Sequence, residues 1–289
     1  MKISFSTLGC PNWTWNEMIA AAVDLGYDGI ELRGVGADLF IPQAKIFLPE
    51  NLPATRASLE KNGLSIPTIA TECLLMKDDA AQREKLRSYL DLAAALGASY
   101  IRVLGDTNPW PDDSVNEELV FQNLCAALPY AEEKKVTMLI ESNGIFADSR
   151  VLRAMIERIG SPYVAALWDI NHPVRYFAED PADTWENIGA YVRHVHVKDS
   201  VMTGGTMHYK MLGYGDLPIQ QAISILKANG YDGFLSLEWT KRWNAELEDA
   251  GIVFSHFAYA IRKNSGDLKS GAEFTAPLFL CAKRRRQAR

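Results

Sequence analysis

The chain has 289 residues, of which 48% are hydrophobic and 23% are charged, and its formal net charge is −6. It has no apolar run near the ~18 residues that a membrane-spanning helix requires, so we expect no membrane partner. The acidic balance argues against nucleic-acid binding, which needs a basic surface. Four widely spaced cysteines argue against a disulfide scaffold or a cysteine-rich zinc cluster, and predict free buried thiols.

Short strand-like runs alternate with segments of helical periodicity along the chain. The predicted strands span residues 3–7, 29–33, 64–71, 100–105, 137–142, 164–170, 194–198 and 234–239. The predicted helices span residues 15–25, 79–96, 119–134, 149–159, 217–228 and 246–262. The order of elements is therefore strand followed by helix along most of the chain.

The tetrapeptide Gly-Tyr-Asp-Gly occurs at 26–29, before the second predicted strand, and again at 230–233, before the eighth. Eight successive strand–helix units with repeated turn chemistry favour an α/β fold of the (β/α)₈ TIM-barrel type over an open sheet. We expect one domain over residues 1–263. Residues 264–289 end in a strongly basic run and are expected to form a partly disordered C-terminal extension.

Four polar side chains stand where predicted strands end, namely Glu141, Asp169, His196 and Glu238. The C-terminal ends of parallel barrel strands meet at one mouth, so these side chains are expected to converge. Three carboxylates and one imidazole form an oxygen-rich ligand set that suits Mn²⁺, Mg²⁺ or Co²⁺, with Zn²⁺ less favoured. The pattern predicts a metalloenzyme.

The strings around these residues resemble the metal-site motifs of the xylose-isomerase-like sugar isomerase and epimerase superfamily. They are Leu139-Ile140-Glu141, Trp168-Asp169-Ile170-Asn171-His172, His194-Val195-His196-Val197-Lys198-Asp199 and Leu237-Glu238. The superfamily includes ketose 3-epimerases, hydroxypyruvate isomerases and inosose dehydratases. The resemblance covers residues 1–262 in matching order.

The resemblance implies that Glu141, Asp169, His196 and Glu238 hold a divalent metal, most favourably Mn²⁺. It also implies that Glu141 and Glu238 act as the acid and base on opposite sides of a substrate. Removing a proton from carbon beside a carbonyl requires a nearby base and stabilisation of the resulting enediolate, which a metal bound to both oxygens supplies. The expected activity is isomerisation or epimerisation of a small sugar, sugar acid or sugar phosphate.

Three further residues are expected to contact substrate. His172 resembles the family's substrate-contacting histidine, with an ordinary loop histidine as the alternative. Lys198 shares a strand face with His196 one step nearer the mouth, where it can approach a substrate oxygen or form a salt bridge. Trp110, like Trp13 and Trp15, belongs to a predicted loop region where an aromatic face can cover a sugar, although core or surface packing is the safer interpretation of each one singly.

Other residues receive mainly structural interpretations. Glu31 and Arg102 are predicted to form a buried ion pair, with substrate binding as the alternative if either side chain reaches the mouth. His194 is predicted to lie deeper in the barrel than His196. Asp199 is expected to orient or cap a neighbouring segment. Two glycines in residues 213–218 predict a turn into the next helix, with phosphate binding as a weaker alternative supported by His208 and Lys210.

One feature departs from the ketose 3-epimerases, in which a second glutamate follows the first ligand closely. Residues 142–147 contain none, which argues against a free-ketose 3-epimerase. An inosose-type dehydratase uses the same metal and the same first proton removal, so it stays an alternative. A catalytically silent sugar-binding barrel is a second alternative. A three-zinc abasic-site endonuclease is disfavoured because the chain has five histidines and an acidic body.

The expected partner is therefore a small carbohydrate, with no nucleic acid and no membrane. The polar start of the sequence does not resemble a secretion signal, so we expect the protein in the cytoplasm. Homo-oligomerisation is common among barrel enzymes and is expected only on that ground.

Overall fold

A computed structural model describes residues 1–106, 110–111 and 114–265. Its main sheet consists of the eight parallel strands β1 (Lys2–Ser6), β2 (Gly29–Glu31), β3 (Ile69–Leu74), β4 (Tyr100–Leu104), β5 (Thr137–Glu141), β6 (Val164–Asp169), β7 (Val192–Val197) and β10 (Phe234–Leu237). Their order in the sheet is β2-β1-β10-β7-β6-β5-β4-β3. All eight predicted strands are confirmed.

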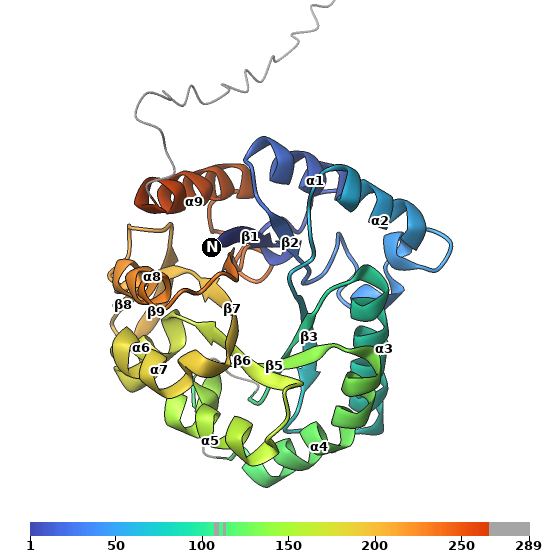
Figure 1. The fold of residues 1–289 in the computed structure, drawn as a ribbon. Helices are drawn as coiled ribbons and strands as arrows, with labels where there is room; N and C mark the ends of the chain where they lie inside the picture. Colours follow the sequence, from blue (N-terminus) through green and yellow to red (C-terminus); the bar gives the residue numbers. More distant parts are fainter. Residues whose placement is uncertain (107–109, 112–113, 266–289) are drawn as a thin grey trace, which may run out of the picture.

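Backbone hydrogen bonds connect the two ends of this order. The amides of Ile30 and Leu32 donate to the carbonyls of Ser65 and Thr68, over 3.0 and 3.2 Å. The amide of Ala70 donates back to the Leu32 carbonyl over 2.8 Å. The strands therefore curve into a barrel surrounded by helices, as Figure 1 shows, and the predicted (β/α)₈ fold is confirmed.

The helices form the outer layer of the barrel (Figure 1). They are α1 (Trp15–Asp24), α2 (Leu52–Lys61), α3 (Ala80–Leu96), α4 (Glu117–Lys134), α5 (Ser149–Ile159), α6 (Asn171–Phe177), α7 (Pro181–Ile188), α8 (Ile219–Ala228) and α9 (Ala250–Ser265). Among the described residues, no helix is long and apolar enough to span a membrane. The expectation for the C-terminal extension concerns residues outside the described range, apart from 264 and 265, which continue α9.

The sequence analysis did not predict α2, α6, α7 or the antiparallel hairpin of β8 (Asp199–Thr203) and β9 (Thr206–Lys210). In α2 only two residues are buried, so its apolar periodicity is weak. The third strand begins at Ile69 rather than at residue 64, because Pro67 has no amide hydrogen to donate to a ladder.

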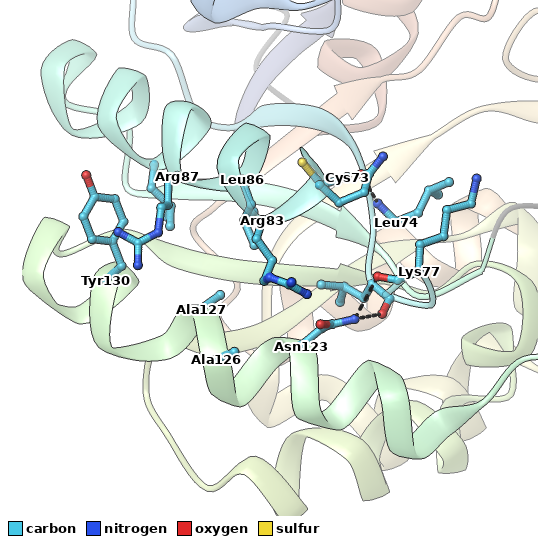
Figure 2. A pocket seen from close by; sticks show the side chains of 13 residues that line it. Cys73, Leu74, Lys77, Arg83, Leu86, Arg87, Asn123, Ala126, Ala127 and Tyr130 are labelled. Atoms are coloured by element: carbon cyan, nitrogen blue, oxygen red, sulfur yellow. Dashed lines mark hydrogen bonds between the residues drawn. The ribbon is translucent and has the colours of Figure 1, made fainter. Parts of the chain in front are cut away.

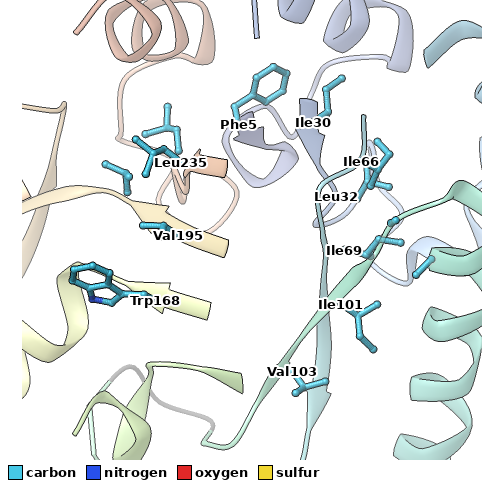
Figure 3. Packing of buried hydrophobic residues seen from close by; sticks show 14 of the residues in the cluster. Phe5, Ile30, Leu32, Ile66, Ile69, Ile101, Val103, Trp168, Val195 and Leu235 are labelled. Atoms are coloured by element: carbon cyan, nitrogen blue, oxygen red, sulfur yellow. The ribbon is translucent and has the colours of Figure 1, made fainter. Parts of the chain in front are cut away.

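Strand side chains alternate between two environments. Figure 3 shows Phe5, Ile101, Trp168 and Val195 pointing from their strands toward the surrounding helices, where the main apolar core lies. The opposite faces of the strands line the barrel interior. Leu139, Ala165 and Leu167 pack together there as a small cluster, and the polar residues that follow on the same faces lie nearer the mouth.

The repeated Gly-Tyr-Asp-Gly segments act as equivalent turns. Gly26 and Gly230 have φ values of 68° and 70°, which favour glycine because a Cβ would be crowded there. The Tyr27 hydroxyl donates to the Phe254 carbonyl over 2.8 Å, and the Tyr231 hydroxyl to the Phe234 carbonyl over 3.1 Å. Each turn thus sends the chain from a helix into the next barrel strand.

Cysteine burial agrees only in part with expectation. Cys10 and Cys73 are buried free thiols, whereas Cys125 is exposed, which corrects the prediction for that residue. Cys125 lies on the outer helix α4, whose apolar residues do not indicate clearly which face meets solvent. Cys281 lies outside the described residues.

Candidate metal centre at the barrel mouth

The four predicted ligands come from neighbouring strands of the barrel. Glu141 and Asp169 end β5 and β6, His196 is the penultimate residue of β7, and Glu238 directly follows β10. All four are buried, and each offers a potential ligand atom within 4.8 Å of the others. The structure therefore brings together residues separated by almost one hundred positions in the sequence.

The His196 imidazole lies at the centre of this cluster. Its Nδ1 atom is 3.3 Å from Glu141 Oε1, 3.5 Å from Glu238 Oε1 and 3.8 Å from Asp169 Oδ2. Its Nε2 atom is 3.0 Å from Glu31 Oε1 on the other side of the ring. Glu31 accordingly orients the imidazole so that Nδ1 faces the three carboxylates.

Glu31 is fully buried and also lies 2.8 Å from His194 Nε2. The predicted Glu31–Arg102 ion pair is wrong. Arg102 Nε lies instead 3.3 Å from Glu141 Oε2. Arg102 is on β4, which pairs with β5, so the carboxylate at the end of the adjacent strand is the one within its reach.

Lys198 completes the cluster on the side toward the mouth. Its Nζ atom is 2.5 Å from Asp169 Oδ2 and also contacts Glu238 Oε2. The salt-bridge alternative for Lys198 is therefore present in the structure. Burial alone would lower the pKa of Lys198, but the carboxylates of Asp169 and Glu238 raise it well above its usual range, so the side chain is an ammonium.

Neighbouring opposite charges also shift the pKa values of Glu141 and His196. Burial alone would raise the pKa of Glu141, but Arg102 and His196 hold it well below its usual range. Burial would lower the pKa of His196, yet the carboxylates of Glu31 and Glu238 raise it well above the ordinary histidine value. Glu141 is therefore ionised, and its negative charge favours a cation in the site.

The donor chemistry fits a divalent cation. Asp169 Oδ2 is buried and accepts no well-aligned hydrogen bond from the part of the chain that the structure describes, although it pairs with the Lys198 ammonium. Carboxylate oxygens with one imidazole nitrogen are the ligands that Mn²⁺, Mg²⁺ and Zn²⁺ accept in proteins. A divalent cation would displace the proton from His196 Nδ1, since a ligand histidine must be neutral.

An aromatic series leads from this cluster to the surface. His172 on α6 is buried, and its Nε2 atom is 3.6 Å from Asp169 Oδ2. Its ring stacks on Tyr176, with centroids 5.8 Å apart, and Tyr176 meets the edge of Trp110 at 5.7 Å. Trp110 is 50% exposed, so it offers an open aromatic face beside the mouth.

The barrel matches a known protein family in sequence. The sequence pattern of the xylose isomerase-like TIM barrel family matches residues 19–257. The chain belongs to this family.

Proteins that are similar in sequence to this xylose isomerase-like chain include a sugar epimerase. Fructoselysine 3-epimerase from Escherichia coli O157:H7 is 25% identical over 259 residues, which cover 82% of this chain and 90% of that protein. This sequence similarity supports an enzymatic role in sugar metabolism.

Two solved structures share the fold. The IOLI protein, determined with a binding zinc atom, has a TM-score of 0.75 and 14% identity over 93% of this chain and 100% of its own. The D-allulose 3-epimerase from Methylomonas sp., determined in complex with D-allulose, has a TM-score of 0.71 and 18% identity over 91% of this chain and 97% of its own.

Asp199 organises the loop after β7 in this xylose isomerase-like barrel. Its buried carboxylate accepts hydrogen bonds from the amides of Gly213, Gly215 and Leu217, over 2.8, 3.0 and 3.4 Å. These amides already bind an anionic side chain, so the phosphate-binding alternative for residues 213–218 receives no support. The expectation that Asp199 orients a neighbouring segment agrees with these contacts.

We expect Asp199→Ala to lower the free energy of unfolding by roughly 3 kcal/mol, because it leaves several amides without their charged acceptor. Urea denaturation measures this loss. Asp249→Ala is the control, since the Asp249 side chain is 83% exposed and its pairing with Lys241 is a surface interaction. Equal stabilities of the two variants would contradict the structural role of Asp199.

The β8–β9 hairpin covers one side of the mouth. Met207 Sδ lies 3.3 Å from Asn171 Nδ2, and the ring of Tyr209 lies 5.9 Å from the Lys198 ammonium. His208 and Lys210, on alternate positions, are exposed. Nothing in the described contacts therefore supports these two residues as the source of positive charge at the site.

Sequence reasoning missed Tyr176 and Tyr209, whereas the packing that it favoured for Trp15 is confirmed. Tyr176 stands four residues after His172, a spacing that places two side chains on one helix face. Tyr209 could not be found without the hairpin. Trp15 begins α1 and is buried against Phe47, with ring centroids 5.8 Å apart, so it packs in the core rather than covering the mouth.

A separate cavity lies outside the barrel, between β3, α3 and α4. Figure 2 shows Cys73, Arg83, Leu86 and Asn123 around it. None of the four clustered residues lines this cavity. Its position on the outer layer separates it from the chemistry at the mouth.

We expect Glu31→Gln to weaken metal binding about 10- to 100-fold, because the amide cannot accept from both histidines as the carboxylate does. Isothermal titration with Mn²⁺ measures the affinity directly. Glu60→Gln, an exposed change on α2, serves as the matched control. An unchanged Mn²⁺ affinity in Glu31→Gln would show that Glu31 does not support His196.

Proposed function

We propose that this protein is a divalent-metal-dependent isomerase or epimerase of a small sugar, sugar acid or sugar phosphate. The observation that carries the proposal is the cluster in which Glu141 and Glu238 stand on either side of Asp169 and His196. Two carboxylates in such positions can exchange protons with opposite sides of a bound substrate.

The two proposed acid–base residues have different surroundings. Glu141 is held by Arg102 through one oxygen and faces His196 through the other. Glu238 faces His196 through Oε1 and contacts Lys198 through Oε2. In our proposal one carboxylate removes the proton next to the carbonyl, and the other returns a proton to the adjacent carbon or to the opposite face.

Asp169 and His196 would complete the ligand set with Glu141 and Glu238, and Mn²⁺ is our first choice among Mn²⁺, Mg²⁺, Co²⁺ and Zn²⁺. A divalent cation bound there would stabilise the negative charge that develops on the substrate oxygens. Burial lets the surrounding side chains act with little screening by water. The Lys198 ammonium, already placed between two carboxylates, is proposed to contact a substrate oxygen.

The walls of the mouth support a carbohydrate as substrate. We propose that His172 donates or accepts a hydrogen bond to a hydroxyl group, with Tyr176 fixing its ring by stacking. Trp110 would cover the apolar face of the sugar. The sugar epimerases among the relatives agree with this substrate class.

Exchange of substrate hydrogen with solvent tests the proposal. The metal-loaded protein is incubated in D₂O with ketoses, sugar acids and inososes, and deuterium incorporation is followed by NMR. Exchange at the carbon next to a carbonyl supports proton abstraction. A new unsaturated-carbonyl absorbance would identify a dehydratase instead, whereas stoichiometric metal without exchange in any compound would favour a sugar-binding barrel.

A further inference from the structure

Arg33 follows β2 at the barrel mouth. Side chains two positions apart on a strand share a face, so Arg33 continues the face of buried Glu31 one step closer to the opening. Burial and the nearby Arg102 guanidinium lower the pKa of Arg33, while Glu72 and Glu238 oppose this effect. Glu238 of the proposed site is thus one of the charged groups that act on the Arg33 guanidinium.

The positive charge of Arg33 lacks a close acidic partner within the part of the chain that the structure describes. Its Nη1 atom is buried and makes no hydrogen bond, and no carboxylate oxygen there forms an ion pair with it. By contrast, Arg102 pairs with Glu141, and Lys198 pairs with Asp169. An unmatched cation at a mouth is costly to desolvate, which makes it a reasonable ligand-binding group.

The Trp243 side chain packs beside Arg33. Its ring lies 5.7 Å from the Arg33 guanidinium carbon, and the side chain is 53% exposed. Trp243 comes from the loop after β10, the strand that Glu238 follows. An aromatic ring and a guanidinium thus lie together, from the segments that follow the two strands on either side of β1.

We propose that Arg33 and Trp243 form a subsite for an anionic group, carboxylate or phosphate, at the end of the substrate remote from its reacting carbonyl. The proposal rests on the proposed function for the reacting end of that substrate. A guanidinium can bind two oxygens of such a group at once, and the indole ring can pack against the adjoining carbon chain. The preferred substrates are then sugar acids or sugar phosphates rather than neutral ketoses.

Paired substrates test this specificity. Solvent-deuterium exchange is measured for D-fructose, D-fructose 6-phosphate and D-fructuronate with the metal-loaded wild type, Arg33→Met and Arg33→Lys. We expect Arg33→Met to lower kcat/KM for the two anionic substrates by about 10- to 100-fold, mainly through KM, while kcat/KM for D-fructose changes much less. Arg33→Lys should retain part of the preference because it keeps the charge.

Lys210→Met is the matched control, since Lys210 is an exposed cation on the nearby hairpin. It should behave as the wild type with each substrate. Circular dichroism and thermal unfolding of every variant establish that the barrel is intact. An equal loss for charged and neutral substrates in folded Arg33→Met, or the same anion-specific loss in Lys210→Met, would overturn the subsite.

A binding measurement separates this inference from the proposed reaction. Isothermal titration of the metal-loaded proteins with inorganic phosphate and with D-gluconate should show about 10-fold weaker binding to Arg33→Met than to the wild type or Lys210→Met. That difference without any turnover would support the subsite while removing the proposed activity. Exchange into neutral ketoses with equal anion binding by all variants would support the activity and overturn the subsite.

Discussion

Glu238→Gln is expected to lower the rate of solvent-deuterium exchange by about 10²- to 10⁴-fold, the range attributed to a positioned general acid or base. Glutamine keeps the shape of the side chain and one oxygen, but it cannot accept a proton at neutral pH. Glu238 is buried, contacts Lys198 and faces His196 Nδ1 at 3.5 Å, so the substitution acts within the proposed site.

The control for this variant is Glu246→Gln, an exposed change in the loop after β10. Metal content is determined for both proteins, because Glu238 is also a proposed ligand and loss of metal would by itself stop turnover. The acid–base role requires that Glu238→Gln lose exchange even when it is loaded with metal. Wild-type exchange in the loaded variant would rule that role out.

Removal of the metal by a chelator is expected to abolish exchange, and Mn²⁺ should restore it. Binding should also stabilise the fold by about 2.7 kcal/mol when free metal exceeds its Kd a hundredfold, which corresponds to a rise in Tm of about 5 °C. Asp169→Asn should lose this rise, because a neutral amide replaces a fully buried carboxylate whose Oδ2 accepts no well-aligned hydrogen bond.

Asp180→Asn provides the comparison for Asp169→Asn. Asp180 caps α7 through its side chain, and asparagine caps helices about as well as aspartate, so its metal response should match the wild type. Thermal unfolding with and without Mn²⁺ measures both variants. If Asp169→Asn keeps the full stabilisation by metal, Asp169 is not a ligand.

The eight strands could be predicted because each combines a short apolar run with a turn or helix on either side. The alternation of side chains along a strand then placed Glu141, Asp169 and His196 on the inner face at the mouth. Elements with few buried residues, such as α2, were missed because they carry little periodicity. The β8–β9 hairpin was missed because its polar, exposed sequence differs little from that of a loop.

The ion-pair partners of side chains inside the barrel were harder to infer than the positions of those side chains. Glu31 was assigned to Arg102 because the two have opposite charges and face the interior, yet Glu31 contacts His194 and His196. Arg102 instead pairs with Glu141 from the adjacent strand. The alternation of side chains along a strand determines which of them point into the barrel. It does not determine which of several oppositely charged side chains come within contact distance.

The sequence by itself determined the barrel, the four residues that gather at its mouth and the resemblance to a sugar isomerase and epimerase family, because strand periodicity and strand ends are local properties. Only the tertiary structure decided that His196 directs Nδ1 toward the carboxylates and that Asp199 accepts hydrogen bonds from the amides of the 213–217 loop. It also decided that Arg33 has no close acidic partner among the described residues. Those facts depend on distances between strands and loops that are remote in the chain, and closure of the barrel sets those distances.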